Sequence, residues 1–173
     1  DLLPELLELL DAAGQRVADE VLPHALAHGA RVPRVRPALL PVLGERGRWL
    51  AAINPDWRYA ALELDDPRSL RVAWERDPAG RAALSLTLRR RDPAAALRLI
   101  ESTWRDDADA SRRELLAMLA TGLSMDDEPF LERALDDRDA QVRYKAAALL
   151  ASLPEARLVR RMIAAAGDIM TLD

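Results

Sequence analysis

The only two histidines, His24 and His28, lie four residues apart, a spacing that can place two imidazoles on one metal ion when the segment is helical. The residue after His24 is Ala25, so the general-base glutamate of a zinc-protease motif is absent. Asp19 and Glu20 are the nearest further ligands, and the chain has no cysteine. We therefore interpret the pair as surface histidines and expect no metal site and no histidine-centred catalysis.

Three acidic clusters could supply the oxygen ligands that hard cations prefer. They are Asp106, Asp107 and Asp109; Asp126, Asp127 and Glu128; and Asp136, Asp137 and Asp139. None follows the EF-hand spacing, and the central loop glycine is missing from each. Each cluster precedes a predicted helix, where carboxylates accept hydrogen bonds from free backbone N–H groups and complement the helix dipole. The clusters therefore predict helix starts.

Other reaction chemistries also lack their residues. The chain has no nucleophile elbow, Walker loop or dinucleotide glycine fingerprint, and its net charge of −4 gives no general attraction to nucleic acid or anionic lipid. No apolar run approaches the roughly 20 residues of a membrane span, and no signal segment opens the chain. We expect a noncatalytic cytoplasmic protein that binds another protein, with no cofactor, no membrane contact and no evident small-molecule substrate.

The elements that must position any site are helices. The chain has 173 residues, of which 50% are hydrophobic and 31% charged, and its apolar residues recur at helical spacing almost throughout. No segment alternates with a period of two, so the predicted fold class is all-α. One helix is expected over 39–53, with kinks at Gly44 and Gly47. Later helices are predicted at roughly 78–90, 93–104, 111–121, 127–136, 139–152 and 155–166.

Capping residues mark where several of these helices begin. An aspartate stands before a proline at 66–67, 77–78 and 92–93, an arrangement that supplies an N-cap and a first helical residue that needs no N–H. Ser111 and Glu114 predict a capping box, Asp139 predicts a cap, and Pro154 is expected to open the last helix. Arg89, Arg90 and Arg91 close a helix and are expected in solvent, whereas Trp74 and Trp104 have core spacing.

The segment 31–59 is the most distinctive part of the chain. Residues 29–60 carry a charge of +4, whereas residues 1–28 carry −5. Arginines interleaved with aromatics can hold phosphates and stack bases, or can form the centre of a protein interface. They can also simply pack a helix into its neighbour, and these three interpretations stay open. The candidate partner-binding residues are Arg46, Arg48, Trp49, Trp57, Arg58 and Tyr59.

The C-terminal helices form pairs that repeat every 30 to 34 residues, a period typical of helical-hairpin solenoids. The unit at 127–153 resembles a HEAT repeat, with an apolar helix, an Asp-rich turn, and Val142-Arg143 opening a second helix. In such repeats the arginine is expected to bond to neighbouring turns. The resemblance implies a right-handed α-α superhelix in one domain, with N-terminal helices over 1–60 and HEAT-like hairpins over 66–167. The chain starts without Met, so we expect it to be part of a longer one.

A second resemblance rests on the run GERGRWLAAINPDWRY at 44–59, with further pieces at 90–96, 101–104 and 127–132. Over roughly 37–162 the chain is similar to an uncharacterised bacterial family of HEAT-like repeat proteins. Members resemble accessory proteins found beside AAA+ ATPases, which implies a scaffold or adaptor. The alternative is a nucleic-acid-binding protein related to HEAT-like DNA glycosylases, which use Trp, Asp and Arg as found together in Asp56-Trp57-Arg58.

Overall fold

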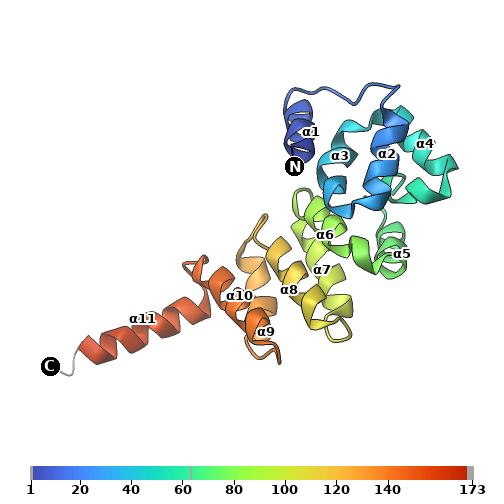
Figure 1. The fold of residues 1–173 in the computed structure, drawn as a ribbon. Coiled ribbons are helices and arrows are strands. Elements are labelled where there is room, and N and C mark those ends of the chain that lie inside the picture. The colour runs from blue at the N-terminus through green and yellow to red at the C-terminus, as the bar shows by residue number, and fades with distance from the viewer. Residues whose placement is uncertain (1, 63, 171–173) are drawn as a thin grey trace. The chain divides into compact units, whose positions relative to one another are not determined.

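In the computed structural model, which describes residues 2–62 and 64–170, every regular element is a helix (Figure 1). The predicted all-α fold class is therefore confirmed over this part of the chain. Two compact units divide it, Asp1–Thr87 and Leu88–Asp173. The right-handed superhelix and the single-domain organisation remain predictions.

The first unit is built from short helices joined by 3₁₀ turns. They are α1 (Leu3–Ala12), α2 (Leu22–Arg31), η1 (Pro33–Val35), α3 (Arg36–Val42), α4 (Gly44–Ile53), η2 (Pro55–Ala60), α5 (Pro67–Arg76) and η3 (Pro78–Gly80). The next helix, α6 (Arg81–Arg89), begins in this unit and ends in the second. Within the unit, α1 packs on α3, and η2 packs on both α2 and α4.

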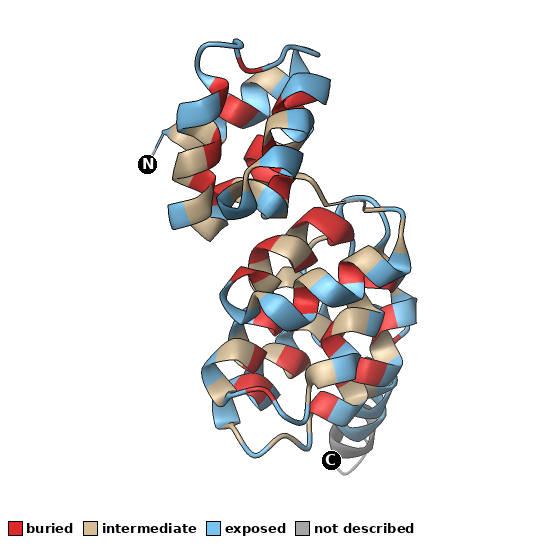
Figure 2. Ribbon diagram, turned by 90° about the vertical axis from the view of Figure 1, so that its right-hand side faces the viewer, coloured by how far each residue is buried: buried red, intermediate tan, exposed pale blue. Residues whose placement is uncertain are grey.

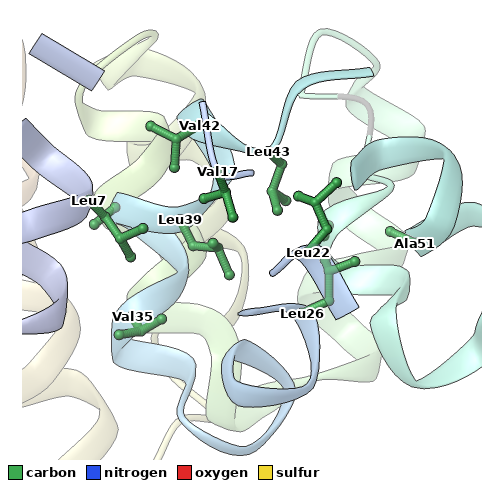
Figure 3. Close-up of a cluster of buried hydrophobic side chains, with 11 residues drawn as sticks. Leu7, Val17, Leu22, Leu26, Val35, Leu39, Val42, Leu43 and Ala51 are labelled. Carbon is green, nitrogen blue, oxygen red and sulfur yellow. The ribbon is translucent and has the colours of Figure 1, made fainter. Parts of the chain in front are cut away.

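A cluster of leucines and valines holds the first unit together (Figure 3). Leu7 of α1, Leu22 and Leu26 of α2, and Leu39 and Val42 of α3 are each at most 4% exposed and point toward one another. Burial of a leucine side chain contributes about 1.5–3 kcal/mol, so these residues account for much of the stability of the unit.

The helix expected over 39–53 is in fact two helices, so that prediction is wrong in its continuity. The helix α3 ends at Val42 and α4 begins at Gly44. Gly44 has φ +65°, in the left-handed region that a residue with a Cβ adopts only with strain. The chain therefore changes direction at Gly44, and the second half becomes a separate helix.

The second unit consists of helical pairs. Its elements are α7 (Pro93–Thr103), α8 (Asp109–Met118), η4 (Met125–Asp127), α9 (Glu128–Ala134), α10 (Ala140–Ala151) and α11 (Arg157–Met170). The helix α10 packs on α8, α9 and α11. Buried residues alternate with exposed ones around each helix except α11, whose described side chains are largely exposed (Figure 2). The core contains six fully buried apolar residues: Ile100, Leu116, Leu119, Leu131, Val142 and Leu150.

Four of the predicted caps are confirmed. The carboxylate of Asp66 accepts from the backbone N–H groups of the first turn of α5, Asp92 does so in α7, and Asp139 in α10. Asp77 caps the 3₁₀ turn η3 by accepting from the Gly80 N–H. Each of these bonds joins residues two or three positions apart, so local sequence is enough to predict it.

Two predicted helix starts are wrong. The helix α8 begins at Asp109, and the expected capping box of Ser111 and Glu114 lies inside it. The Arg112 guanidinium donates to the Asp107 backbone carbonyl and to the Asp109 carboxylate, which stabilises an earlier first turn. The capping box occurs instead between Ser124 and Asp127.

The last helix does not start at Pro154. It begins at Arg157, whose backbone N–H donates to the Glu128 carboxylate of α9 at 2.6 Å. The cap of α11 therefore comes from a residue 29 positions earlier. Such a partner is invisible to a local capping pattern.

Candidate functional site

The helix α4 is fixed by small residues on one face. A Cβ on Gly47 would lie 2.8 Å from the Leu43 Cβ and 3.2 Å from the Leu22 Cδ2, so only glycine permits this close approach. Ala51, one turn later, is fully buried. Trp49 and Ile53 lie about 200° around the helix from these two residues and are 60% and 61% exposed. The seating of α4 therefore directs an aromatic and an aliphatic side chain outward.

Arginines flank this exposed face. Arg46 forms an ion pair with Asp19, with Nη1 2.7 Å from Oδ2, and both side chains are more than half exposed. Arg48 is exposed and has no ion-pair partner within 2–62 and 64–170. Of the six residues predicted to bind a partner, Arg48 and Trp49 are thus displayed on α4, while Arg46 is already engaged with an acidic side chain.

Trp57 and Tyr59 play a structural part in the first unit. Both are half-buried and pack against the leucine and valine cluster. The Tyr59 hydroxyl donates to the Leu26 carbonyl at 3.0 Å, and the Arg36 guanidinium lies 4.4 Å from the centre of its ring. Burial raises the pKa of Tyr59 to about 12, and the positive charge of Arg36 partly opposes this rise. Both aromatics therefore contribute to the packing of the first unit.

A cavity of about 740 Å³ lies in the first unit beside Tyr59. Its walls come from α3, η2, α5, η3 and α6, and Arg58 and Tyr59 are the two predicted residues that line it. The other charged residues in its lining are Arg36, Asp56, Asp66, Arg68, Arg76 and Asp77. The sequence did not predict this cavity, because its walls come from segments as far apart in the chain as Arg36 and Thr87.

Two of the cavity carboxylates are committed to the fold. Asp77 lies 2.7 Å from Arg36 and accepts from the Gly80 N–H. Asp66 accepts from the N–H groups of Arg68 and Ser69 and from the Ser69 hydroxyl, and the hydroxyl bond is the largest influence that lowers the Asp66 pKa.

Arg89 was expected in solvent, and that prediction is wrong, because the residue is only 2% exposed. Its guanidinium donates to both carboxylate oxygens of Asp127 at 2.8 Å. It also donates to the backbone carbonyls of Thr121 and Gly122. No local sequence signal marks this position, because the Thr121 carbonyl and the Asp127 carboxylate lie 32 and 38 residues later in the chain.

Arg112 is the second buried arginine, and it links consecutive helical pairs. It is 3% exposed and donates to Asp109 and to Asp137, whose carboxylate lies in the turn between α9 and α10. Arg143 was expected to bond to neighbouring turns. It donates instead to the carbonyls of Asp137 and Arg138 in its own turn.

Surface ion pairs of the second unit show a regular separation. Glu101 pairs with Arg133, which lies 32 residues later. Three further pairs join residues that are 29 positions apart: Asp109 with Arg138, Glu128 with Arg157, and Glu132 with Arg161. The separation of 32 residues lies within the predicted period of 30 to 34 residues, whereas the separation of 29 residues is one residue shorter than that period. Acidic residues that were interpreted as helix-start chemistry thus also connect successive pairs.

The histidines and acidic clusters gather no metal-ligand set in the described ranges, where no three His, Cys, Asp or Glu side chains could hold an ion together. His24 is exposed and His28 is half-buried. Trp74 is buried as predicted, and Trp104 is half-buried against Phe130, with ring centroids 4.9 Å apart. Among the helices that can be described, none is long and apolar enough to cross a bilayer.

The fold and these surfaces define an all-helical protein with an outward-facing tryptophan and an arginine-rich cavity. The chain belongs to a family of unknown function (DUF5691), which matches residues 1–173. No curated protein and no solved structure matches the chain.

Proposed function

We propose that this chain is a noncatalytic protein-binding module whose contact surface centres on Trp49. The observation that carries the proposal is the pair of Trp49 and Ile53, exposed by 60% and 61% on one face of α4. Tryptophan and arginine dominate the energetic centres of protein interfaces, and Arg48 lies beside this pair. The partner surface should therefore offer an apolar pocket for the indole and a carboxylate for Arg48.

The rigid seating of α4 supports this assignment. Gly47 and Ala51 hold the opposite face of the helix against the core. Because the helix that carries the Trp49 indole is already ordered, binding a partner would lose little conformational entropy. The resemblance to accessory proteins adds an AAA+ ATPase as the first partner class to test. We also propose that the helical pairs are HEAT-like repeats, a proposal supported by the ion pairs that recur at 29 and 32 residues.

The experiment compares pull-downs from a lysate of the source organism, with and without nuclease, using three variants of the full chain. Trp49→Ala removes the proposed contact, and we expect it to lose a discrete set of proteins that the wild type retains. Tyr144→Ala is the matched control, because Tyr144 is 71% exposed in the other unit, and it should retain the set. Trp57→Ala removes core packing and should lower the circular dichroism melting temperature.

Two results would overturn the proposal. Retention of the same proteins by Trp49→Ala would show that the α4 face is not the contact. Capture that disappears after nuclease treatment would favour the alternative, a nucleic-acid-binding protein related to HEAT-like DNA glycosylases.

A further inference from the structure

We propose that the cavity of the first unit binds a small organic anion, in which a carboxylate or phosphate group is attached to an aromatic or branched aliphatic body. The site is separate from the Trp49 face and does not depend on the protein-binding proposal.

The cavity has the size and lining that such a ligand needs. Its volume of about 740 Å³ lies within the range of roughly 300–1,000 Å³ that is usual for small-molecule pockets. Leu40, Leu62, Val72 and Leu84 contribute apolar side chains from four different segments. Val72 is 47% exposed although it lines this space, so an apolar group in the cavity would remove its side chain from water.

Arginines stand where the anionic group would bind. Arg68, Val72 and Arg76 follow one another at four-residue intervals, which places both guanidinium groups on the same side of α5 as the exposed valine. Arg58 reaches the cavity from η2. All three arginines are exposed, so the anionic group would bind at the open side of the cavity.

The carboxylates of the cavity offset part of this positive charge, and the lining as a whole, with four arginines and three aspartates, keeps an excess of one positive charge. Asp77 is paired with Arg36, and Asp66 is held by the N–H groups and hydroxyl of the first turn of α5. Asp66 keeps its negative charge and interacts with Arg68, and Asp56 is the third carboxylate in the lining. Guanidinium groups bind carboxylate and phosphate through two parallel hydrogen bonds. An anion with an apolar body would therefore bind the arginines through its charged group and the apolar side chains of the cavity through its body.

The test is a titration of the full chain with phenyl phosphate, followed by two-dimensional NMR. We expect saturable shifts at Leu40, Leu62, Val72 and Leu84, with a dissociation constant in the millimolar range or tighter, as is usual for a ligand of this size. Benzyl alcohol lacks the charge, and inorganic phosphate lacks the apolar body. Each should bind at least tenfold more weakly than phenyl phosphate.

Variants locate the binding groups. The double variant Arg68→Ala/Arg76→Ala should weaken phenyl phosphate binding at least tenfold. The control Arg31→Ala/Arg71→Ala removes the same charge from exposed positions outside the cavity and should change the affinity less than twofold. Val72→Trp should abolish binding by filling the cavity, with an unchanged circular dichroism spectrum.

Several outcomes would overturn the proposal. Shifts that do not saturate, or that concentrate outside the cavity, would show that phenyl phosphate has no site there. If benzyl alcohol bound as tightly as phenyl phosphate, the site would not require an anionic group. If inorganic phosphate bound as tightly, the site would not require an apolar body. If both double variants lost the same affinity for phenyl phosphate, the overall charge of the protein, and not the cavity arginines, would explain the binding.

Discussion

Arg89 and Arg112 are buried in the second unit, and the terminal nitrogens of each guanidinium donate to several acceptors, although the Nε of Arg112 has no partner among the described residues. Arg89 and Arg112 are 2% and 3% exposed, and each donates to a carboxylate and to at least one backbone carbonyl. A buried guanidinium without these partners would carry a large desolvation penalty. The pairs therefore make the relative placement of their helices specific, since any shift would leave a charge unpaired.

Removal of the Arg89 side chain is expected to destabilise the second unit strongly. Arg89→Ala leaves the Asp127 carboxylate buried, at 1% exposure, without its guanidinium partner. Breaking a buried ion pair from one side costs about 3–5 kcal/mol. Urea unfolding should show this loss, whereas Arg105→Ala, at an exposed position of the same unit, should change the free energy of unfolding by no more than about 0.5 kcal/mol. Equal losses in the two variants would contradict the role of the buried pair.

Tyr59 gives the first unit a dependence on alkaline pH. Its pKa is about 12 in the folded protein, above the ordinary 10.0, because burial favours the neutral phenol. The folded state therefore holds this proton more tightly than the unfolded state does. The contribution of the neutral Tyr59 side chain to the free energy of unfolding is complete below about pH 10 and is lost as the pH rises toward 12.

Tyr59→Phe isolates this effect. The variant loses the hydrogen bond to the Leu26 carbonyl, so at neutral pH it should be less stable than the wild type by about 0.5–1.5 kcal/mol. The difference between the two proteins should shrink as the pH rises from 10 toward 12, because only the wild type has a phenol at position 59, and this phenol ionises more readily in the unfolded state than in the folded state. Chemical unfolding at a series of pH values measures it. A difference that stays constant over this range would contradict the raised pKa.

At the scale of the helices, the starts of successive elements are stabilised by residues from earlier ones. Glu128 of α9 accepts from the first backbone N–H of α11, and Glu132 pairs with Arg161 one turn further on. The bond from the Arg157 N–H is the largest influence on Glu128 and lowers its pKa from the ordinary 4.5. Two contacts at helical spacing thus fix the first turns of α11 against α9.

The start of α11 should open in acid. Because the folded pKa of Glu128 is lowered, its stabilising effect is complete above about pH 4.5 and declines as the pH falls through the folded pKa. Hydrogen exchange at the Arg157 amide should therefore lose protection below that pH. Glu128→Gln should weaken protection already at neutral pH and remove this acid dependence, whereas Glu155→Gln, at an exposed acid nearby, should leave both unchanged. Acid-sensitive protection in the Glu128 variant would refute the assignment.

Helix starts also show which features a sequence can predict. Asp66, Asp92 and Asp139 cap helices through bonds to residues two or three positions away, so a local pattern of residue types was sufficient. Glu128 and Arg89 act on partners 29 and 38 residues away. Their roles depend on which helices pack together, and a local pattern contains no such information.

The candidate site also has features that the sequence predicts and features that depend on how the helices pack. An Arg- and Trp-rich segment could be selected from composition, but composition treats Trp49 and Trp57 alike. The structure separates them because Gly47 seats α4 with Trp49 outward, whereas η2 turns Trp57 toward the core. The cavity needed the packing of η2, α5 and α6 and was not predictable from residue types.

At the scale of the whole molecule, each compact unit has a core of its own. Leu26 lies in the cluster of the first unit, and Leu131 lies among the buried residues of the second, each 0% exposed. Truncation of a buried leucine to alanine costs about 2–5 kcal/mol, because it removes buried methyl groups and leaves a cavity. The two positions are thus a matched pair with the same side chain and the same burial in different units.

Leu26→Ala and Leu131→Ala should therefore each destabilise mainly their own unit. Amide hydrogen exchange of the full chain should show that Leu26→Ala lowers protection within 2–62 and 64–87, and that Leu131→Ala lowers it within 88–170. The physical reason is that subglobal opening exposes the core that has lost its methyl groups, while the other core keeps its contacts. If either variant lowered protection equally in both ranges, the two units would unfold as one cooperative body, and the single-domain prediction would be supported by its energetics.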